Sequence, residues 1–270
     1  MHNTTFIQTS NRLRTKVNHA LCLHDFEWAG SNTLPMNRLF FLFRSRGGYI
    51  RHHDHGRIVK ELELKTNHIY FMPKNAELSF RFEKGTGVVA FHFTLEAFGG
   101  FDLLDGIKDC RMTKASAAEI APIRHIMENT ESPRDAVMLQ ALLLQHCCAF
   151  MDEDKSALPH QIVLDERYRS LFEQIEASPN AGLTIGELAQ AAGLSRDALS
   201  KSFRKDFGIP LKTFLQRRLV DHASEMLLYT DMRIGEIALK LNFNDEYYFS
   251  RFFKKHTGSS PSVFRKKTTI

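Results

Sequence analysis

Two stretches of the chain repeat one pattern. "IGELAQAAGLSRDALSKSFRKDFG" occupies residues 185–208, and "IGEIALKLNFNDEYYFSRFFKKHTG" occupies residues 234–258, so the two copies start 49 residues apart. Each copy has an Ile-Gly-Glu start, a small Ala one turn later, a short break, and a second segment of paired large apolar residues and cations. A match that spans two segments and the break between them indicates one supersecondary unit used twice.

The residues at the breaks predict that each unit is a helix-turn-helix. Thr184 with Glu187 forms a capping-box pattern, which fixes the start of the first helix. Gly193 permits the left-handed backbone that ends this helix, and Asn242, the next best residue for that conformation, takes its place in the second copy. The second helix of each copy is preceded by a good N-cap residue, Ser195 or Asp245.

The second helix of each copy has an apolar face and a polar face. Leu199 and Phe203 point inward in the first copy, as Phe249 and Phe253 do in the second. The polar faces carry stripes at i, i+3, i+4 and i+7: Asp197, Ser200, Lys201 and Arg204, then Tyr247, Ser250, Arg251 and Lys254. Further candidate contacts flank them: Arg196, Lys205, Glu246, Tyr248 and Lys255. One such stripe is typical of any solvent-exposed helix face, but two stripes at equivalent positions of two helix-turn-helix units predict DNA binding.

Charge and length support the same interpretation. Residues 195–270 hold 15 Lys and Arg against 8 Asp and Glu, so their net charge of 15 − 8 = +7 exceeds the net charge of +5 for the whole chain. Such an excess favours a polyanionic partner. The helix expected from Pro210 between the copies would be roughly 27 Å long for about 18 residues. That length is near one turn of B-DNA, so the two units could enter successive major grooves of an operator.

The front of the chain has a different pattern. Short strands rich in Phe, Val and Ile, separated by turn residues, are expected at 38–44, 58–64, 68–73, 77–82 and 88–93. Helices are expected from Ala115 and from Pro133, and residues 155–161 are the best linker candidate. We therefore predict an α+β chain, with an antiparallel barrel and two helices over residues 1–158 and an all-α domain over residues 159–270.

The apolar segments and the cysteines of the chain indicate the cellular compartment to expect. No charged and apolar leader opens the chain, and the apolar run at 136–151 contains Gln and His and is too short for a membrane span. The four cysteines, at 22, 110, 147 and 148, lack a CxxC pair. We expect reduced structural thiols in a cytoplasmic protein that does not contact a membrane.

Residues of about 165–267 resemble the DNA-binding domain of AraC/XylS-type transcription regulators. The resemblance rests on "ELAQAAGLSRDALSKSFRKDFG", the long connecting helix, "FNDEYYFSRFFKKHTG" and the closing "SPSVFRK". This chain has Asn242 before Phe243 where the family commonly has Gly, and Lys201 where it commonly has Arg. Lys is a point charge without the fork of Arg, which bears on any bidentate contact to guanine.

The front half is similar, more loosely, to the sensor half of these regulators, a cupin-like barrel followed by two dimerisation helices. In "NHIYFMPKNAELSF", Asn67 and Asn75 stand where the family has glycines. The resemblance implies a small effector, with a carbohydrate as the first expectation and an aromatic or organic acid as the next. The candidate ligand residues are Trp28, Arg38, Phe41, Phe43, Tyr70 and His92.

The helix from Arg134 to Met151 is apolar nearly all round, and one barrel covers only one side of it. A large uncovered apolar face is unusual in a soluble monomer. We therefore expect a homodimer through this helix, unless the helix is buried entirely within its own domain. The candidate contacts are Leu139, Leu142 and Leu143.

Two other classes of protein compete with this interpretation. A cupin-type metal enzyme could use His53, His55, Glu61 and His92, but His55 lies beside Asp54 and Gly56 in what reads as a hairpin tip. A ligand-independent DNA-binding protein would not need a patterned front domain. The sequence shows no phosphate loop, GxSxG or HExxH, so we expect no catalytic residues, no metal and no cofactor.

Overall fold

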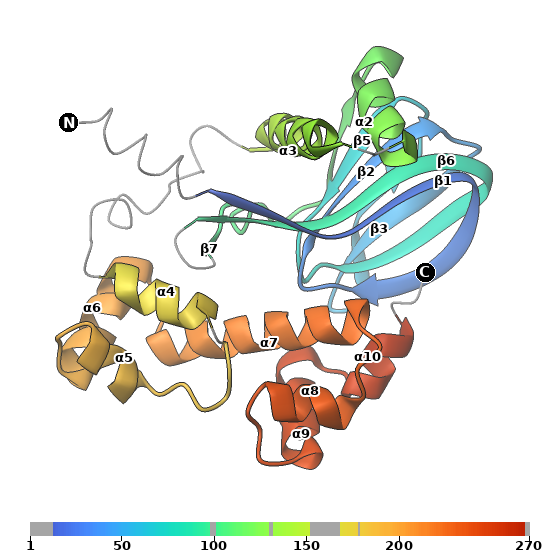
Figure 1. Cartoon of the computed structure of the whole chain (residues 1–270). Coiled ribbons are helices and arrows are strands. Elements are labelled where there is room, and N and C mark those ends of the chain that lie inside the picture. Colours follow the sequence, from blue (N-terminus) through green and yellow to red (C-terminus); the bar gives the residue numbers. More distant parts are fainter. Residues whose placement is uncertain (1–12, 98–100, 130–131, 152–167, 178, 268–270) are drawn as a thin grey trace, which may run out of the picture. The chain divides into compact units, whose positions relative to one another are not determined.

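The computed structural model describes residues 13–97, 101–129, 132–151, 168–177 and 179–267. The chain divides into two compact units (Figure 1). The first contains most of the sheet and the two helices that follow it, and the second contains the later helices. The boundary predicted at residues 158 and 159, and the linker predicted at 155–161, lie outside the described residues. None of the described helices is long and apolar enough to cross a membrane.

The first unit is a nearly closed antiparallel β-barrel. Its strand order is β4-β3-β6-β2-β5-β8, and β1 and β7 also pair with β6. The strands are β1 (Arg14–Thr33), β2 (Asn37–Arg44), β3 (Gly48–Asp54), β4 (Arg57–Glu63), β5 (His68–Met72), β6 (Glu77–Ala97), β7 (Phe101–Asp102) and β8 (Arg111–Lys114). This confirms the predicted α+β class, a barrel followed by a helical domain.

Strand β6 differs from the prediction. Two strands were expected, at 77–82 and 88–93, but the structure runs both as one strand of 21 residues. Gly85, at φ +92°, and a hydrogen bond from the Thr86 hydroxyl to the Glu83 carbonyl let the strand bend there. Phe82 then pairs with Gly48 of β3, and Gly87 with Arg44 of β2. The glycines form a corner in the barrel, which local turn chemistry does not distinguish from a chain reversal.

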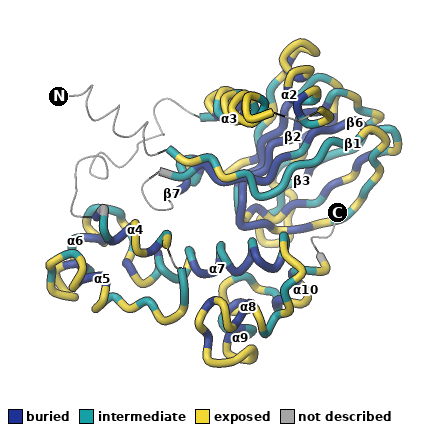
Figure 2. The backbone as a smooth tube through the Cα atoms, viewed as in Figure 1, coloured by how far each residue is buried: buried dark blue, intermediate teal, exposed yellow. Residues whose placement is uncertain are grey.

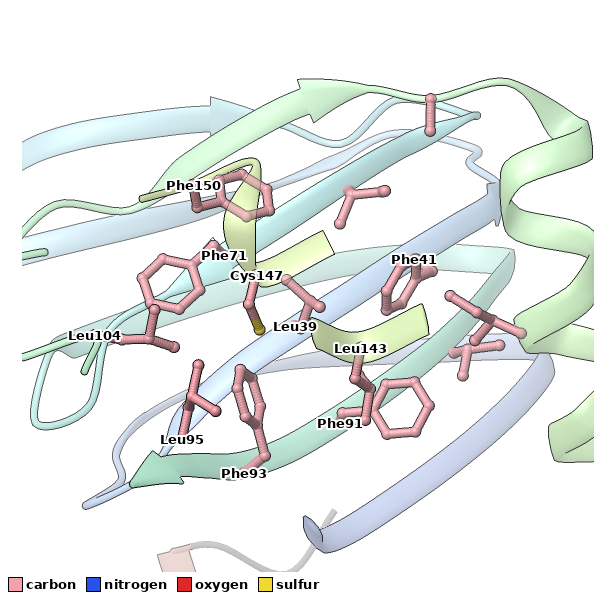
Figure 3. Close-up of a cluster of buried hydrophobic side chains, with 14 of the residues drawn as sticks. Leu39, Phe41, Phe71, Phe91, Phe93, Leu95, Leu104, Leu143, Cys147 and Phe150 are labelled. Atoms are coloured by element: carbon pink, nitrogen blue, oxygen red, sulfur yellow. The ribbon is translucent and has the colours of Figure 1, made fainter. Parts of the chain in front are cut away.

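Strand β2 separates two hydrophobic cores. Leu39 and Phe41 face a cluster that also holds Phe71, Phe91 and Leu143, on the face covered by helices (Figure 3). Phe40 and Leu42 face the other cluster, enclosed by the curl of the sheet, with partners from β3 to β6. We call these the outer core and the barrel interior. Alternate residues of one strand serve both, because successive side chains point to opposite faces.

Two helices supply the cover of the outer core. Helix α2 (Ala117–Asn129) buries Ile120, Ile123 and Ile126. Helix α3 (Pro133–Cys148) starts with a capping box from Ser132 to Asp135 and has Pro at its first position, as predicted.

Apart from β7 and the ends of β1 and β6, the regular structure of the second unit is helical. It contains α4 (Arg169–Ala177), α5 (Ile185–Ala191), α6 (Arg196–Phe207), α7 (Leu211–Tyr229), α8 (Ile234–Lys240), α9 (Glu246–Thr257) and α10 (Pro261–Lys267). Aromatic side chains dominate the core around the first repeat, where Phe203 packs on Phe207, Phe214 and Tyr168. Around the second repeat, Phe253 packs on Phe249 and Phe264. The sequence repeat is therefore also a repeat of structure, α5–α6 and α8–α9.

Candidate functional site

The turns of the two repeats have the same backbone geometry. Gly193 has φ +65° and Asn242 has φ +59°, so both occupy the left-handed region, as predicted. The Thr184 hydroxyl accepts from the Glu187 N–H, and the Glu187 carboxylate accepts from the Thr184 N–H, which completes the capping box. These features fix the angle at which each second helix leaves its turn.

Helices α6 and α9 present equivalent faces. Leu199 and Phe203 of α6, and Phe249 and Phe253 of α9, are all 0% exposed. The N-cap side chains of Ser195 and Asp245 accept from the N–H three residues later. Figure 2 shows the other face of each helix largely exposed. The second helices are therefore anchored on their apolar sides and leave their polar sides to solvent.

The exposed faces hold the predicted stripes. Asp197, Lys201 and Arg204 are exposed on α6, with Ser200 half-buried and its hydroxyl donating to the Arg196 carbonyl. On α9 the side chain of Tyr247 is 71% exposed, and the Arg251 guanidinium lies 5.6 Å from the centre of its ring. Ser250 is half-buried. The remaining candidates on these helices are exposed: Arg196, Lys205, Glu246, Tyr248, Lys254 and Lys255. Each stripe thus offers cations, hydroxyl groups and a carboxylate or an aromatic ring.

The helix between the repeats is long and well anchored. Helix α7 has 19 residues, which corresponds to about 28 Å. The predicted start, Pro210, is its N-cap, so the helix begins one residue later, and eight of its residues are buried, among them Phe214, Leu219 and Leu227. Both α8 and α9 contact it, and so does α6. A single rigid helix therefore connects the two units.

The barrel interior contains a small polar cluster among aromatic rings. Arg38 is 1% exposed, donates to the Asn32 side chain at 2.6 Å, and lies 5.5 Å from the ring centre of Phe80. His92, on the neighbouring β6, is directly opposite Arg38 in the strand register. Its ring stacks on Phe40 at 6.5 Å between centroids. A fixed cation and an imidazole thus lie beside apolar surface.

The charge states of this cluster follow from burial. Burial, followed by the nearby positive charge of Arg38 and by His19, lowers the pKa of His92 to about 3. His92 is therefore neutral at physiological pH and offers one donor and one acceptor.

The other ligand candidates divide between the two cores. Trp28 is half-buried and its ring lies 5.6 Å from Phe80, so it borders the barrel interior. Tyr70 also lies there, but its hydroxyl donates to the Glu63 carbonyl and accepts from the Lys65 N–H, which ties down a turn. Phe41 and Phe43 belong to the outer core. The sequence could not reveal this division, because β2 is apolar on both faces.

The residues considered for a cupin metal site do not come together. His55 is at the tip of the β3–β4 hairpin, with a side chain 97% exposed and φ +50°, as its neighbours indicated. His53 contacts the Ser79 hydroxyl, and Glu61 pairs with Arg51. Among the described residues, the group of three side chains that could hold a metal is a different one, Cys22, His24 and Glu128.

The buried imidazole predicts a pH dependence of stability. Because the pKa of His92 is lower in the folded than in the unfolded chain, the unfolded state binds more protons between pH 3 and 6.5, and stability falls as the pH drops through this window. From pH 7 to pH 5 we expect His92 to account for a loss of about 2 kcal/mol. Urea denaturation of the wild type and His92→Gln at both pH values measures this. His55→Gln, at the exposed hairpin tip, is the control, and equal pH dependence in all three proteins would contradict the assignment.

A family model described as a helix-turn-helix domain matches residues 188–267. An uncharacterised HTH-type transcriptional regulator of Staphylococcus aureus is 30% identical over 141 residues, which is 52% of this chain and 19% of that protein. The chain thus matches about a fifth of the length of such relatives. The HTH-type transcriptional activator RhaR of Klebsiella pneumoniae is 24% identical, over 93% of this chain and 86% of its own.

Solved structures extend the likeness to the whole chain. Wild-type ToxT from Vibrio cholerae, crystallised with a bound unsaturated fatty acid, has a TM-score of 0.52 at 11% identity and covers 95% of this chain and 96% of its own. A second crystal form of ToxT has a TM-score of 0.51 at 14% identity. At such identities the likeness concerns the fold, a barrel followed by helix-turn-helix units. The sequence matches agree with the resemblance stated above: residues 188–267 of this chain match a helix-turn-helix domain, and the relatives RhaR and the Staphylococcus aureus protein are named as HTH-type transcriptional regulators.

Proposed function

We propose that the protein is a sequence-specific DNA-binding transcription regulator that responds to a small ligand in its barrel. The observation that carries the proposal is the pair of matched, exposed stripes on α6 and α9. Repetition is the decisive feature, since a solvated helix face need not recur at equivalent positions of two equivalent scaffolds. The name of the relative RhaR, a transcriptional activator, supports this class of function over an enzyme.

The two stripes divide into base-reading and backbone-binding positions. Lys201 and Arg251 are equivalent positions at the middle of each stripe, where a recognition helix approaches base edges. Lys205 and Lys255 lie near the helix ends, beside the stripe, where side chains reach phosphates. Lys201 contributes a point charge and Arg251 a fork, so we expect the second unit to discriminate guanine more sharply.

Binding to DNA tests this division. Lys201→Ala and Arg251→Ala should each cost about 1–3 kcal/mol on the cognate site and relax discrimination there. Lys255→Ala should weaken cognate and random DNA equally and reduce the salt slope by about 1. Fluorescence anisotropy over a range of salt concentrations measures both. If Lys201→Ala and Arg251→Ala lowered binding to cognate and random DNA by one common factor, the base-reading role would be wrong.

For the ligand, the barrel interior favours an organic carboxylate with an apolar body. Arg38 places a fixed guanidinium among aromatic and aliphatic side chains, and such a group recognises a carboxylate through paired hydrogen bonds. His92 adds a neutral N–H, and Phe40 and Phe80 supply apolar surface. The fatty acid bound to ToxT is consistent with this class. The carbohydrate expected from the sequence becomes the second candidate, with the half-buried Trp28 as its packing surface.

A matched ligand pair separates these candidates. We expect palmitoleate to bind the full-length protein and its methyl ester, which lacks the charge, to bind at least tenfold more weakly. Arg38→Gln should lower the affinity for the acid by roughly the same factor and leave the affinity for the ester unchanged. Isothermal titration measures both, with a panel of pentoses and hexoses as the alternative. Equal binding of acid and ester, or saturation by a sugar alone, would contradict the carboxylate assignment.

We also propose a homodimer through α3. The side chains of Val137 and Met138 are 72% and 43% exposed, and Ala141 and Cys148 continue this exposed stripe along the helix. Of the residues named from the sequence, Leu143 is 0% exposed in the outer core, and Leu139 and Leu142 pack partly against it. The candidate contacts therefore move to the opposite side of the same helix.

Sedimentation velocity tests the dimer. The double variant Val137→Asp, Ala141→Asp should sediment as a folded monomer at tens of micromolar, because two carboxylates cannot be buried across a two-fold interface. Ala118→Asp, in the exposed first turn of α2, is the charge control and should remain a dimer. A wild-type monomer at this concentration, or an unchanged mass in the double variant, would refute the interface.

A further inference from the structure

Three side chains with metal-binding atoms meet on the outer face of the barrel. Cys22 and His24 lie two residues apart in β1, so their side chains share one face of the strand. Glu128 is near the end of α2 and contacts both of these side chains. Their ligand atoms all lie within 4.8 Å of one another. The site is built from secondary-structure elements rather than a loop, and its members are far apart in sequence.

The distances among the three atoms are those of a tetrahedral metal site. Cys22 Sγ lies 3.9 Å from His24 Nε2 and 3.8 Å from a Glu128 carboxylate oxygen, and His24 Nε2 lies 2.9 Å from that oxygen. Tetrahedral zinc bonds of about 2.3 Å to sulfur and about 2.1 Å to nitrogen and oxygen would place sulfur about 3.6 Å from the other ligands. The same bonds would separate nitrogen and oxygen by about 3.4 Å. The observed separations differ from these values by about half an ångström or less.

Neighbouring residues hold the ligands in place. The guanidinium of Arg124 lies 3.6 Å from the Glu128 carboxylate, one helical turn away, and 5.1 Å from the ring centre of Phe43. The His24 ring packs on the same phenylalanine at 5.4 Å. Arg44 donates to the His24 carbonyl and, at 2.7 Å, to that of Gly85. Metal-binding carboxylates and imidazoles commonly have such outer partners, which fix their orientation.

We propose that Cys22, His24 and Glu128 form a binding site for a divalent metal ion of the zinc class. A thiolate, an imidazole and a carboxylate are the donors that zinc takes in proteins, and hard cations such as magnesium would not choose the sulfur. The two anionic ligands neutralise the charge of the ion. The metal can reach the site from solvent, because the side chain of His24 is 59% exposed.

Binding exchanges a proton for the metal. The sulfur–metal bond forms as the S–H bond breaks, and the proton goes to solvent. The bound ion would fasten β1 to α2 in place of the hydrogen bonds that now link them.

Titration of zinc and cobalt into the reduced, chelator-treated full-length protein tests the proposal. We expect one equivalent per chain, a sulfur-to-cobalt charge-transfer band, and an increase in thermal stability that grows with free zinc. Cys22→Ser, His24→Gln and Glu128→Gln should each lower zinc affinity at least tenfold. Cys22→Ser should also remove the charge-transfer band.

Two variants serve as matched controls. Cys148→Ser removes an exposed thiol, and His125→Gln removes an exposed imidazole from α2, and both should bind zinc as the wild type does. Protection of Cys22 from alkylation by zinc provides a readout that needs no variant to fold. The site would be refuted by absent zinc binding, by unchanged affinity in Cys22→Ser, or by equal loss in Cys148→Ser.

Discussion

The burial of both faces of β2 is the constraint on which the barrel depends. This strand pairs with β5 on one side and β6 on the other, and its residues 39–42 are between 0% and 5% exposed. If β2 shifted by one residue against its partner strands, Leu39 and Phe41 would face the barrel interior, and Phe40 and Leu42 would face the outer core. The same register sets Arg38 opposite His92. The polar cluster in the interior is thus positioned by the packing of its apolar neighbours.

The two faces serve different purposes. The interior face places a cation and an imidazole among aromatic rings, which suits the enclosure of a small ligand. On the outer face, α2 and α3 cover the strand and offer two further surfaces: the exposed stripe of α3, and the proposed metal site of Cys22, His24 and Glu128. A change in the barrel would reach both helices through the outer core, since close-packed interiors transmit small displacements.

The second unit was the more predictable part of the chain, because its signals are local. Gly193, Asn242 and the caps at Ser195 and Asp245 specify their own backbone geometry, and the repeat doubles the evidence. Asn67 and Asn75 also have positive φ, at +58° and +61°, which explains how they replace glycines.

What the sequence did not reveal depends on contacts between distant residues. Gly85 could mark a turn or a barrel corner, and only the partners of β6 decide between them. That Phe41 and Phe43 face the outer core, whereas Arg38 and His92 face the barrel interior, becomes known only once the orientation of β2 is known. The burial of Leu143 likewise becomes known only once α3 is placed on the barrel. Cys22 and His24 are joined to Glu128 by the packing of α2 over β1, for which no spacing in the sequence gives a signal.

In a regulator of the proposed kind, occupancy of the barrel and binding of DNA are coupled, and reciprocity tests this coupling directly. The affinity of the full-length protein for operator DNA is measured with and without saturating palmitoleate, and its affinity for palmitoleate with and without saturating operator. Linkage requires the two factors to be equal, and a typical coupling of about 1–3 kcal/mol gives factors of about 5 to 150. We predict equal factors in this range. Tight binding of the acid that leaves operator affinity unchanged would contradict the account.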